Sequence, residues 1–85
     1  MRILLAEDEI PLARAIKKIF EKNNYSADAV HSGEDALMYL ETGSYDVAVL
    51  DVMMPKMDGI AVLRTLRARG DRIPVLMLTA KSEID

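Results

Sequence analysis

The chain has 85 residues, of which 51% are hydrophobic and 29% are charged, and its formal net charge is -3; these values predict one globular domain. The negative charge argues against a nucleic-acid-binding domain, and the absence of cysteine excludes disulfides, thiolate metal ligands and cysteine nucleophiles. No hydrophobic run approaches the roughly 20 residues needed to span a bilayer, and no signal peptide is recognisable, so we expect a cytoplasmic protein without membrane contacts.

The first part of the chain is predicted to form a strand, a helix and a second strand. Residues 2–6 are hydrophobic on both faces, as in a strand buried inside a parallel sheet. Residues 11–22 have the spacing of an amphipathic helix with proline in its first turn. The residues expected on its buried face are Leu12, Ile16, Ile19 and Phe20. Residues 25–30 carry small and polar side chains, which indicates a weaker strand at a sheet edge.

A second helix is predicted to begin after Ser32 and to end at Gly43. Ser32 is followed three residues later by Asp35, which approximates a capping box, and glycine is common at the carboxyl-terminal cap. The residues of this helix expected to face the core are Leu37 and Leu40. His31, the only histidine, precedes the helix and is interpreted as a surface residue, because one histidine without partners makes no metal site.

The remaining elements are predicted to be a strand, a helix and a strand. Residues 47–50 and 74–78 are both strongly hydrophobic, as in buried strands. Between them, Asp58 can cap a helix over residues 59–68, and Gly70 can close it. The residues of this helix expected to point inward are Ile60, Leu63 and Leu66. Regular alternation of strands and helices predicts an α/β fold, a doubly wound parallel sheet with helices on both faces.

Acidic residues follow two of these strands, at the point where each strand ends. Glu7, Asp8 and Glu9 come directly after the first strand, and Asp51 comes directly after the third. Because functional groups gather at the carboxyl ends of parallel strands, we expect these carboxylates to face one another. Like charges held close together are costly unless a cation or a proton relieves them. The sequence therefore predicts a divalent-cation site with one carboxylate free for chemistry.

Further residues occur at characteristic positions around these acids. They are Glu7 and Asp8 after the first strand, Asp51 after the third, Pro55, Met57, Asp58 and Gly59 beyond it, and Thr79 and Ala80 after the fourth. In this order and spacing they resemble the receiver domain of bacterial two-component response regulators. The resemblance covers essentially the whole chain, and although each motif is weak alone, the combination is highly specific.

The resemblance implies a role for each matching residue. Asp51 matches the phosphoacceptor, which takes a phosphoryl group from a sensor histidine kinase. Glu7 and Asp8 match the acidic pair that holds Mg²⁺, with Asp51 and the backbone carbonyl of Met53 as further ligands. Thr79 matches the hydroxyl that turns toward the phosphoryl group. Such a domain is not an enzyme, although it can catalyse its own phosphorylation and dephosphorylation. Its parent usually controls an output, often transcription through a separate DNA-binding domain.

The resemblance also implies a flavodoxin-like fold with strand order 2-1-3-4-5. We expect residues 1–85 to be a single truncated receiver domain with four strands in the order 2-1-3-4 and three helices. The fifth strand, the last two helices and the lysine that pairs with the phosphoryl group are expected to be missing. The fourth strand would then be an exposed edge, so we expect impaired phosphorylation and self-association through that strand.

Three other functions stay open. A phosphatase of the haloacid dehalogenase type also forms an aspartyl-phosphate, but it typically needs a second acid where this chain has Met53. A nucleotide- or flavin-binding domain would need a glycine-rich turn where this chain has the acids at positions 7–9. A pure interaction module that acts by dimerisation is the third.

The matching residues also have alternative structural roles. Thr79 could be an ordinary threonine at a strand end, and Glu7 and Asp8 could be acids favoured by the next helix's dipole.

Overall fold

Strands and helices alternate along the part of the chain that the computed structural model describes, residues 1–78. The elements are β1 (Arg2–Ala6), α1 (Ile10–Lys22), β2 (Ser26–Val30), α2 (Gly33–Thr42), β3 (Val47–Asp51), α3 (Gly59–Ala68) and β4 (Val75–Leu78). This order confirms the predicted alternation, with boundaries shifted by one residue at several ends. None of the helices within residues 1–78 combines the length and the hydrophobicity needed to cross a bilayer.

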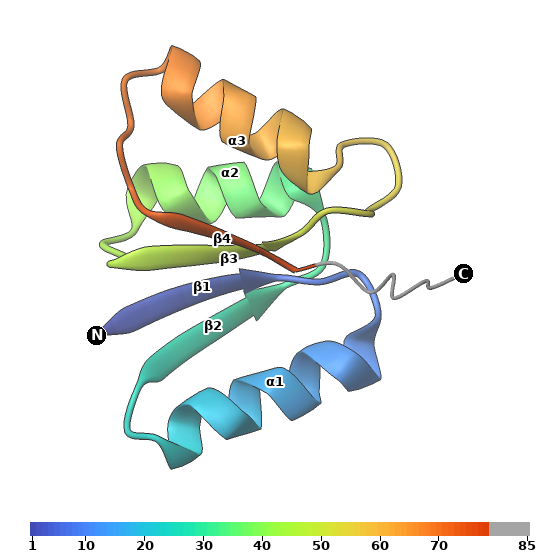
Figure 1. Ribbon diagram of the computed structural model, residues 1–85, viewed down its shortest axis with the longest axis vertical. Helices are drawn as coiled ribbons and strands as arrows, with labels where there is room; N and C mark the ends of the chain where they lie inside the picture. Colours follow the sequence, from blue (N-terminus) through green and yellow to red (C-terminus); the bar gives the residue numbers. More distant parts are fainter. Residues whose placement is uncertain (79–85) are drawn as a thin grey trace.

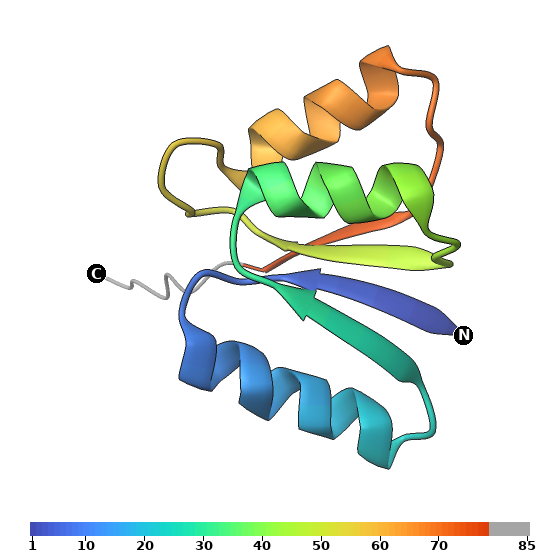
Figure 2. The same cartoon turned by 180° about the vertical axis from the view of Figure 1, so that it is seen from behind.

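The four strands form one parallel sheet in the order β2-β1-β3-β4. Ala6 at the end of β1 is in register with Val30 of β2 and with Leu50 of β3, so the carboxyl ends of these strands meet at one edge of the sheet. Helix α1 lies on one face of the sheet, and α2 and α3 lie together on the other (Figures 1 and 2). The predicted doubly wound fold, the strand order 2-1-3-4 and the edge position of β2 are confirmed.

The hydrophobic core has two parts, one on each face of the sheet. On the face covered by α2 and α3, the buried side chains include those of Leu4, Leu50, Val62 and Leu66. On the face covered by α1, the buried side chains are those of Ile3, Leu5, Ala13, Ala27 and Val49. The side chains of β1 and β3 contribute to both parts, which explains why these two strands are hydrophobic on both faces.

Two of the predicted helix caps are present. Ser32 Oγ accepts a hydrogen bond from the backbone N–H of Asp35 at 3.1 Å, and α2 begins directly after it. Asp58 Oδ1 accepts one from the backbone N–H of Ala61 at 2.9 Å, and α3 begins directly after it. Each cap satisfies a backbone donor that the first helical turn leaves free, so both helices start at a defined residue.

The buried face of α1 differs from the predicted one. Ala13 is fully buried, and Ile16 and Phe20 pack against the core. Leu12 and Ile19, both predicted to face inward, are 39% and 58% exposed. Since each helical residue turns the chain by about 100°, these two residues stand beside the buried stripe. The prediction was wrong for them because it left out Ala13, which lets the helix approach the sheet closely.

The same kind of shift is found in α3. Leu66 is buried as predicted, and Leu63 is partly buried. Ile60, predicted to point inward, is 38% exposed, whereas Val62 is fully buried. The buried stripe therefore runs through Gly59, Val62 and Leu66, three and four residues apart. Helix α3 turns its smallest residue toward the sheet, and Ile60 is rotated away as a result.

Helix α1 leaves part of its face of the sheet uncovered. A hollow of about 380 Å³ lies beside it, and its walls are mostly hydrophobic. Residues that line it include Phe20 from α1, Ile3 from β1, Val47 and Val49 from β3, and Leu76 from β4. Leu76 is 62% exposed. The outer half of this sheet face is therefore a hydrophobic surface within the described part of the chain.

The amino-terminal end of the sheet is held by a polar cluster. The Arg2 guanidinium donates to Asp28 Oδ2 at 2.9 Å and lies 4.5 Å from the centre of the Tyr45 ring. Tyr45 Oη donates to the same carboxylate at 2.6 Å. The Arg2 backbone N–H donates to Asp46 Oδ2 at 2.7 Å. These contacts join β1, β2 and the segment before β3 at the end of the sheet opposite the acidic residues.

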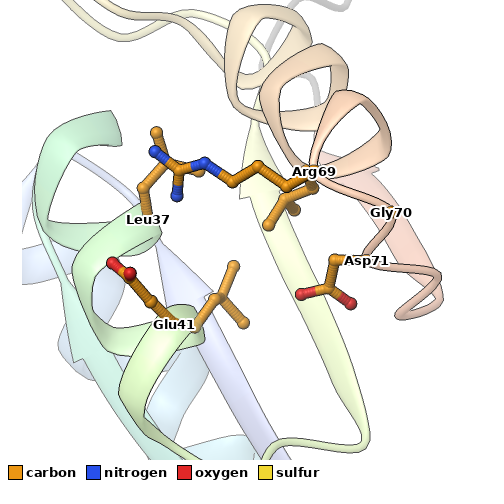
Figure 3. A pocket seen from close by; sticks show the side chains of 7 residues that line it. Leu37, Glu41, Arg69, Gly70 and Asp71 are labelled. Atoms are coloured by element: carbon orange, nitrogen blue, oxygen red, sulfur yellow. The ribbon is translucent and has the colours of Figure 1, made fainter.

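A second hollow lies between the carboxyl-terminal parts of α2 and α3. It has a volume of about 350 Å³, with Leu37 and Leu66 among the residues that line it and with Glu41, Arg69 and Asp71 as its charged residues. Figure 3 shows the Arg69 side chain extending from the end of α3 toward α2. Because the helices run antiparallel to the strands, this hollow is also far from the strand ends that carry the acids.

Candidate functional site

Three of the predicted acidic residues are brought together at the carboxyl ends of β1 and β3. Glu7 and Asp8 follow β1, and Asp51 is the last residue of β3. One carboxylate oxygen from each lies within 4.8 Å of those from the other two. Glu9, in contrast, is outside this group and occupies the amino-terminal cap position of α1. The adjacency of β1 and β3 in the sheet explains why residues so far apart in sequence meet.

Glu7 and Asp51 are the only buried charged or polar side chains within residues 1–78, at 4% and 5% exposure. The ion pairs found in this part of the chain lie elsewhere, between Arg2 and Asp28 and between Lys17 and Glu21. Burying a charge without a partner is costly. The acidic cluster therefore carries negative charge that no described basic side chain neutralises.

Burial and charge repulsion change the acidity of Glu7. Removal of the carboxyl from water raises its pKa above the ordinary value of 4.5, and the nearby carboxylates of Asp51 and Asp8 raise it further. The backbone N–H of Glu9, which donates to Glu7 Oε2 at 3.0 Å, acts in the opposite direction. Burial is the largest of these effects. The site thus favours either a proton on Glu7 or a cation nearby.

A backbone amide orients Asp51. The N–H of Met53 donates to Asp51 Oδ1 at 3.0 Å, which fixes the rotation of the carboxylate at the end of the strand. The sequence pointed to the Met53 carbonyl as a metal ligand, and that role stays a prediction. The contribution of the Met53 amide was missed because it depends on the path of the loop after β3.

The start of α3 packs directly against the end of β3. A Cβ added at Gly59 would lie 2.4 Å from the carbonyl oxygen of Asp51, closer than two such atoms can approach. The N–H of Gly59 donates to the carbonyl oxygen of Val52 at 3.2 Å. Glycine is therefore required at this position for the helix to reach the strand end, and this explains its place directly after Asp58.

Sequence reasoning missed one contact beside the acidic cluster. His31, interpreted as a surface residue, is exposed, yet its Nδ1 lies 3.0 Å from the carbonyl oxygen of Glu7. No pattern in the sequence joins these two residues. They meet because β2 is parallel to β1 and in register with it, so the residues that follow the two strands lie side by side.

The donor set of the cluster fits Mg²⁺. This ion prefers oxygen ligands, is often bound through one or two carboxylates and keeps several waters. Glu7, Asp8 and Asp51 supply such oxygens and an uncompensated negative charge. Thr79, the predicted switch hydroxyl, lies outside the residues that the structure describes.

Comparison with known families agrees with this geometry. Residues 3–85 match the family model described as the response regulator receiver domain. The chain belongs to this family. Receiver domains bind Mg²⁺ at an acidic pocket and act as phosphoacceptors in two-component signalling. The described part of this chain has an acidic cluster, formed by Glu7, Asp8 and Asp51.

Curated relatives are response regulators of greater length. The chain is 43% identical over 83 residues to the transcriptional regulatory protein DltR of Streptococcus agalactiae, covering 98% of this chain and 37% of the relative. It is 45% identical over 84 residues to the transcriptional regulatory protein TctD of Salmonella typhimurium, with 99% and 38% covered. The chain thus spans little more than a third of the length of these relatives.

Solved receiver structures have the same fold. The receiver domain of the Francisella response regulator 1452 superposes with a TM-score of 0.91 at 38% identity, covering 96% of this chain and 68% of that one. The response regulator TrrA of Thermotoga maritima, solved in complex with Mg(2+)-BeF, gives a TM-score of 0.90 at 32% identity, with 95% and 70% covered. The receiver fold inferred from the sequence is confirmed.

Proposed function

We propose that Asp51 is the phosphoacceptor of this receiver domain and takes its phosphoryl group from a sensor histidine kinase. The observation that carries the proposal is the meeting of three carboxylates, two of them buried, at the ends of β1 and β3. Glu7, Asp8, Asp51 and the Met53 carbonyl would hold Mg²⁺. The Mg(2+)-BeF complex of TrrA supports this choice of metal.

The geometry suits nucleophilic attack by a carboxylate. A bond forms between an Asp51 oxygen and phosphorus while the bond from phosphorus to the kinase imidazole nitrogen breaks, and that nitrogen keeps the electron pair. The Met53 amide donates to Asp51 Oδ1 and restrains the orientation of the attacking carboxylate. Bound Mg²⁺ would neutralise the charge that repels an anionic donor from an anionic site.

Mass spectrometry can test this assignment. Because phosphorylation of this chain is expected to be impaired, we expect a fraction of the molecules to gain the mass of one phosphoryl group when the chain is incubated with Mg²⁺ and acetyl phosphate. This gain should be lost in EDTA. Asp51→Asn serves as the matched control, since it keeps the size of the side chain and removes the nucleophile. An equal mass gain in Asp51→Asn would place the phosphoryl group elsewhere. No gain in the native chain would favour the interaction module described below.

The output of the whole protein follows from its relatives by analogy. We infer that residues 1–85 form one receiver domain whose parent acts in the cytoplasm and controls transcription through a DNA-binding domain. The names of DltR and TctD as transcriptional regulatory proteins support this inference. The domain itself would be no enzyme beyond catalysing its own phosphorylation and dephosphorylation. Thr79 would supply the hydroxyl that responds to the phosphoryl group.

A second candidate function for the 85-residue chain is self-association through β4. Within residues 1–78, β4 pairs only with β3, so its other edge has unpaired backbone groups. Leu76 on this strand is 62% exposed and borders the hydrophobic hollow beside α1. Exposed hydrophobic edges of this kind are templates for pairing with another chain. A single monomeric species at micromolar concentration in light scattering would contradict this proposal.

A further inference from the structure

The short segment between β2 and α2, residues 31–33, lies between the two loops that carry the acidic site. On one side, His31 Nδ1 is 3.0 Å from the carbonyl oxygen of Glu7. On the other side, Gly33 packs so tightly against Met57 that an added Cβ would lie 2.5 Å from the Met57 carbonyl oxygen. Segment 31–33 therefore contacts both the loop after β1 and the loop after β3.

The imidazole of His31 extends the pairing of β1 with β2 beyond the sheet. The N–H of Glu7 donates to the carbonyl oxygen of Val30 at 3.0 Å, as a ladder bond would. The carbonyl oxygen of Glu7 would accept the next hydrogen bond of such a ladder, but no backbone N–H within residues 1–78 donates to it. The His31 ring lies where this donor would be. Glu7 is 4% exposed, and buried carbonyl groups normally have a donor. The imidazole thus takes the place of a backbone amide.

We propose that His31 is a positioning residue of the acidic site: by donating from Nδ1 to the Glu7 carbonyl, it fixes the peptide group between Glu7 and Asp8. This inference rests on the proposed function, in which both carboxylates hold Mg²⁺. Because the peptide group is planar, its rotation swings the residues on both sides together. One hydrogen bond on this carbonyl therefore restrains two metal ligands at once.

The proposal requires a particular tautomer. A neutral imidazole carries one N–H, so donation to a carbonyl oxygen from Nδ1 means that the proton is on Nδ1 and that Nε2 is bare. Free histidine favours the opposite tautomer. A histidine that is only a surface residue would keep the free preference, and its replacement would leave metal binding unchanged.

A matched pair of variants separates these cases. His31→Asn places an amide N–H near the position of Nδ1, and His31→Leu has the same branching without a donor. We expect His31→Leu to weaken Mg²⁺ binding about 10-fold and His31→Asn to stay within about two-fold of the native chain, because residues that orient metal ligands typically change affinity by 10- to 100-fold. Dissociation constants come from Mg²⁺ titrations followed by amide chemical shifts in NMR spectra, which also report whether each variant is folded.

A second measurement needs neither a variant nor a metal. Long-range ¹⁵N–¹H spectra of the native chain at a pH where the ring is neutral distinguish the two tautomers, and we expect Nδ1–H. A predominant Nε2–H tautomer, or Mg²⁺ affinity in folded His31→Leu equal to that of the native chain, would overturn the role of His31. Failure of the native chain to bind Mg²⁺ would instead overturn the proposed metal site, and the tautomer would still decide whether the hydrogen bond exists.

Discussion

Glu7 and Asp51 are both acidic, yet their side chains are buried side by side. This arrangement makes the stability of the fold depend on pH and on Mg²⁺ binding. The pKa of Glu7 is raised above 4.5, mainly by burial and also by the neighbouring carboxylates. When the pKa of a group is higher in the folded state than in the unfolded state, folding favours the protonated group. The stability that results is fully present at pH values below the unfolded-state pKa. That stability is lost as the pH rises through the folded-state value. In Mg²⁺-free buffer we therefore expect the contribution of Glu7 to the free energy of unfolding to fall as the pH rises above about 4.5.

Urea unfolding at several pH values, with and without Mg²⁺, measures this effect. The Glu7→Gln variant should lose the Glu7 part of the pH dependence. It should be more stable than the native chain without Mg²⁺ at neutral pH, since one buried charge is removed. Mg²⁺ at 100 times its dissociation constant should stabilise the native chain by about 2.7 kcal/mol, and the variant by less. A native chain that grows more stable from pH 5 to pH 8 without metal, by the same amount as Glu7→Gln, would contradict the argument.

Tyr45 at the other end of the sheet gives a separate prediction. Burial and the hydrogen bond to Asp28 raise its pKa to about 12 from 10.0. The stability that comes from this shift is complete below pH 10 and is lost as the pH rises through about 12. Tyr45→Phe should lower the free energy of unfolding by about 1.5 kcal/mol, the low end for a hydrogen bond to a charged group, because Asp28 is partly exposed. Absorbance titration should show that the variant has lost the phenol that ionises near pH 12.

At the scale of the elements, the contact of α3 with the end of β3 depends on Gly59. Gly59→Ala places a methyl group 2.4 Å from the Asp51 carbonyl oxygen, so the helix or the strand end must move. We expect a loss of about 1–3 kcal/mol in the free energy of unfolding, together with weaker Mg²⁺ binding because Asp51 is displaced.

Gly70 provides the matched control. Its φ is +82°, a conformation that disfavours alanine, but a Cβ there would have nothing within 4 Å. Gly70→Ala should lower stability by about 1 kcal/mol and leave Mg²⁺ affinity unchanged. Chemical denaturation and Mg²⁺ titration of both variants separate strain from displacement of the site. Equal Mg²⁺ affinities for the two variants would show that the Gly59 contact does not position Asp51.

The sequence predicts the elements and the sheet order of this chain better than the burial of single residues. The elements and the sheet order could be inferred because hydrophobic runs, caps at Ser32 and Asp58, and alternation are local signals. Glu7, Asp8 and Asp51 could be placed together because they directly follow neighbouring strands. Leu12 and Ile60 were wrongly predicted to be buried. A small neighbouring residue, Ala13 in α1 and Gly59 in α3, determines which side of each helix approaches the sheet.

Contacts between loops could not be inferred at all. The bond from the Met53 amide to Asp51 and the contact between His31 and Glu7 depend on where a loop turns after its strand. Such turns are set by packing across the whole site, for example by Gly33 against Met57, and leave no periodic pattern in the sequence.

For the molecule as a whole, the exposed part of the sheet predicts how the 85-residue chain associates. Leu76→Lys puts a charge on the edge strand and should shift the chain toward the monomer, with little effect on folding because Leu76 is 62% exposed. Met38→Lys, at a residue of α2 that is 55% exposed, is the matched control and should leave association unchanged. Light scattering across a concentration series measures both. Equal association of the two variants would exclude β4 as the contact.

The strand order also determines when the acidic cluster can form during folding. Strand β1 is made first, but it lies between β2 and β3, and Ile3 pairs with Val47. Contacts between residues distant in sequence form slowly, since a long loop must close first. A nascent chain therefore carries Glu7 and Asp8 without Asp51 beside them until β3 has been made and has joined β1. Capture of a metal ion by all three carboxylates would mark the moment at which the two central strands have joined.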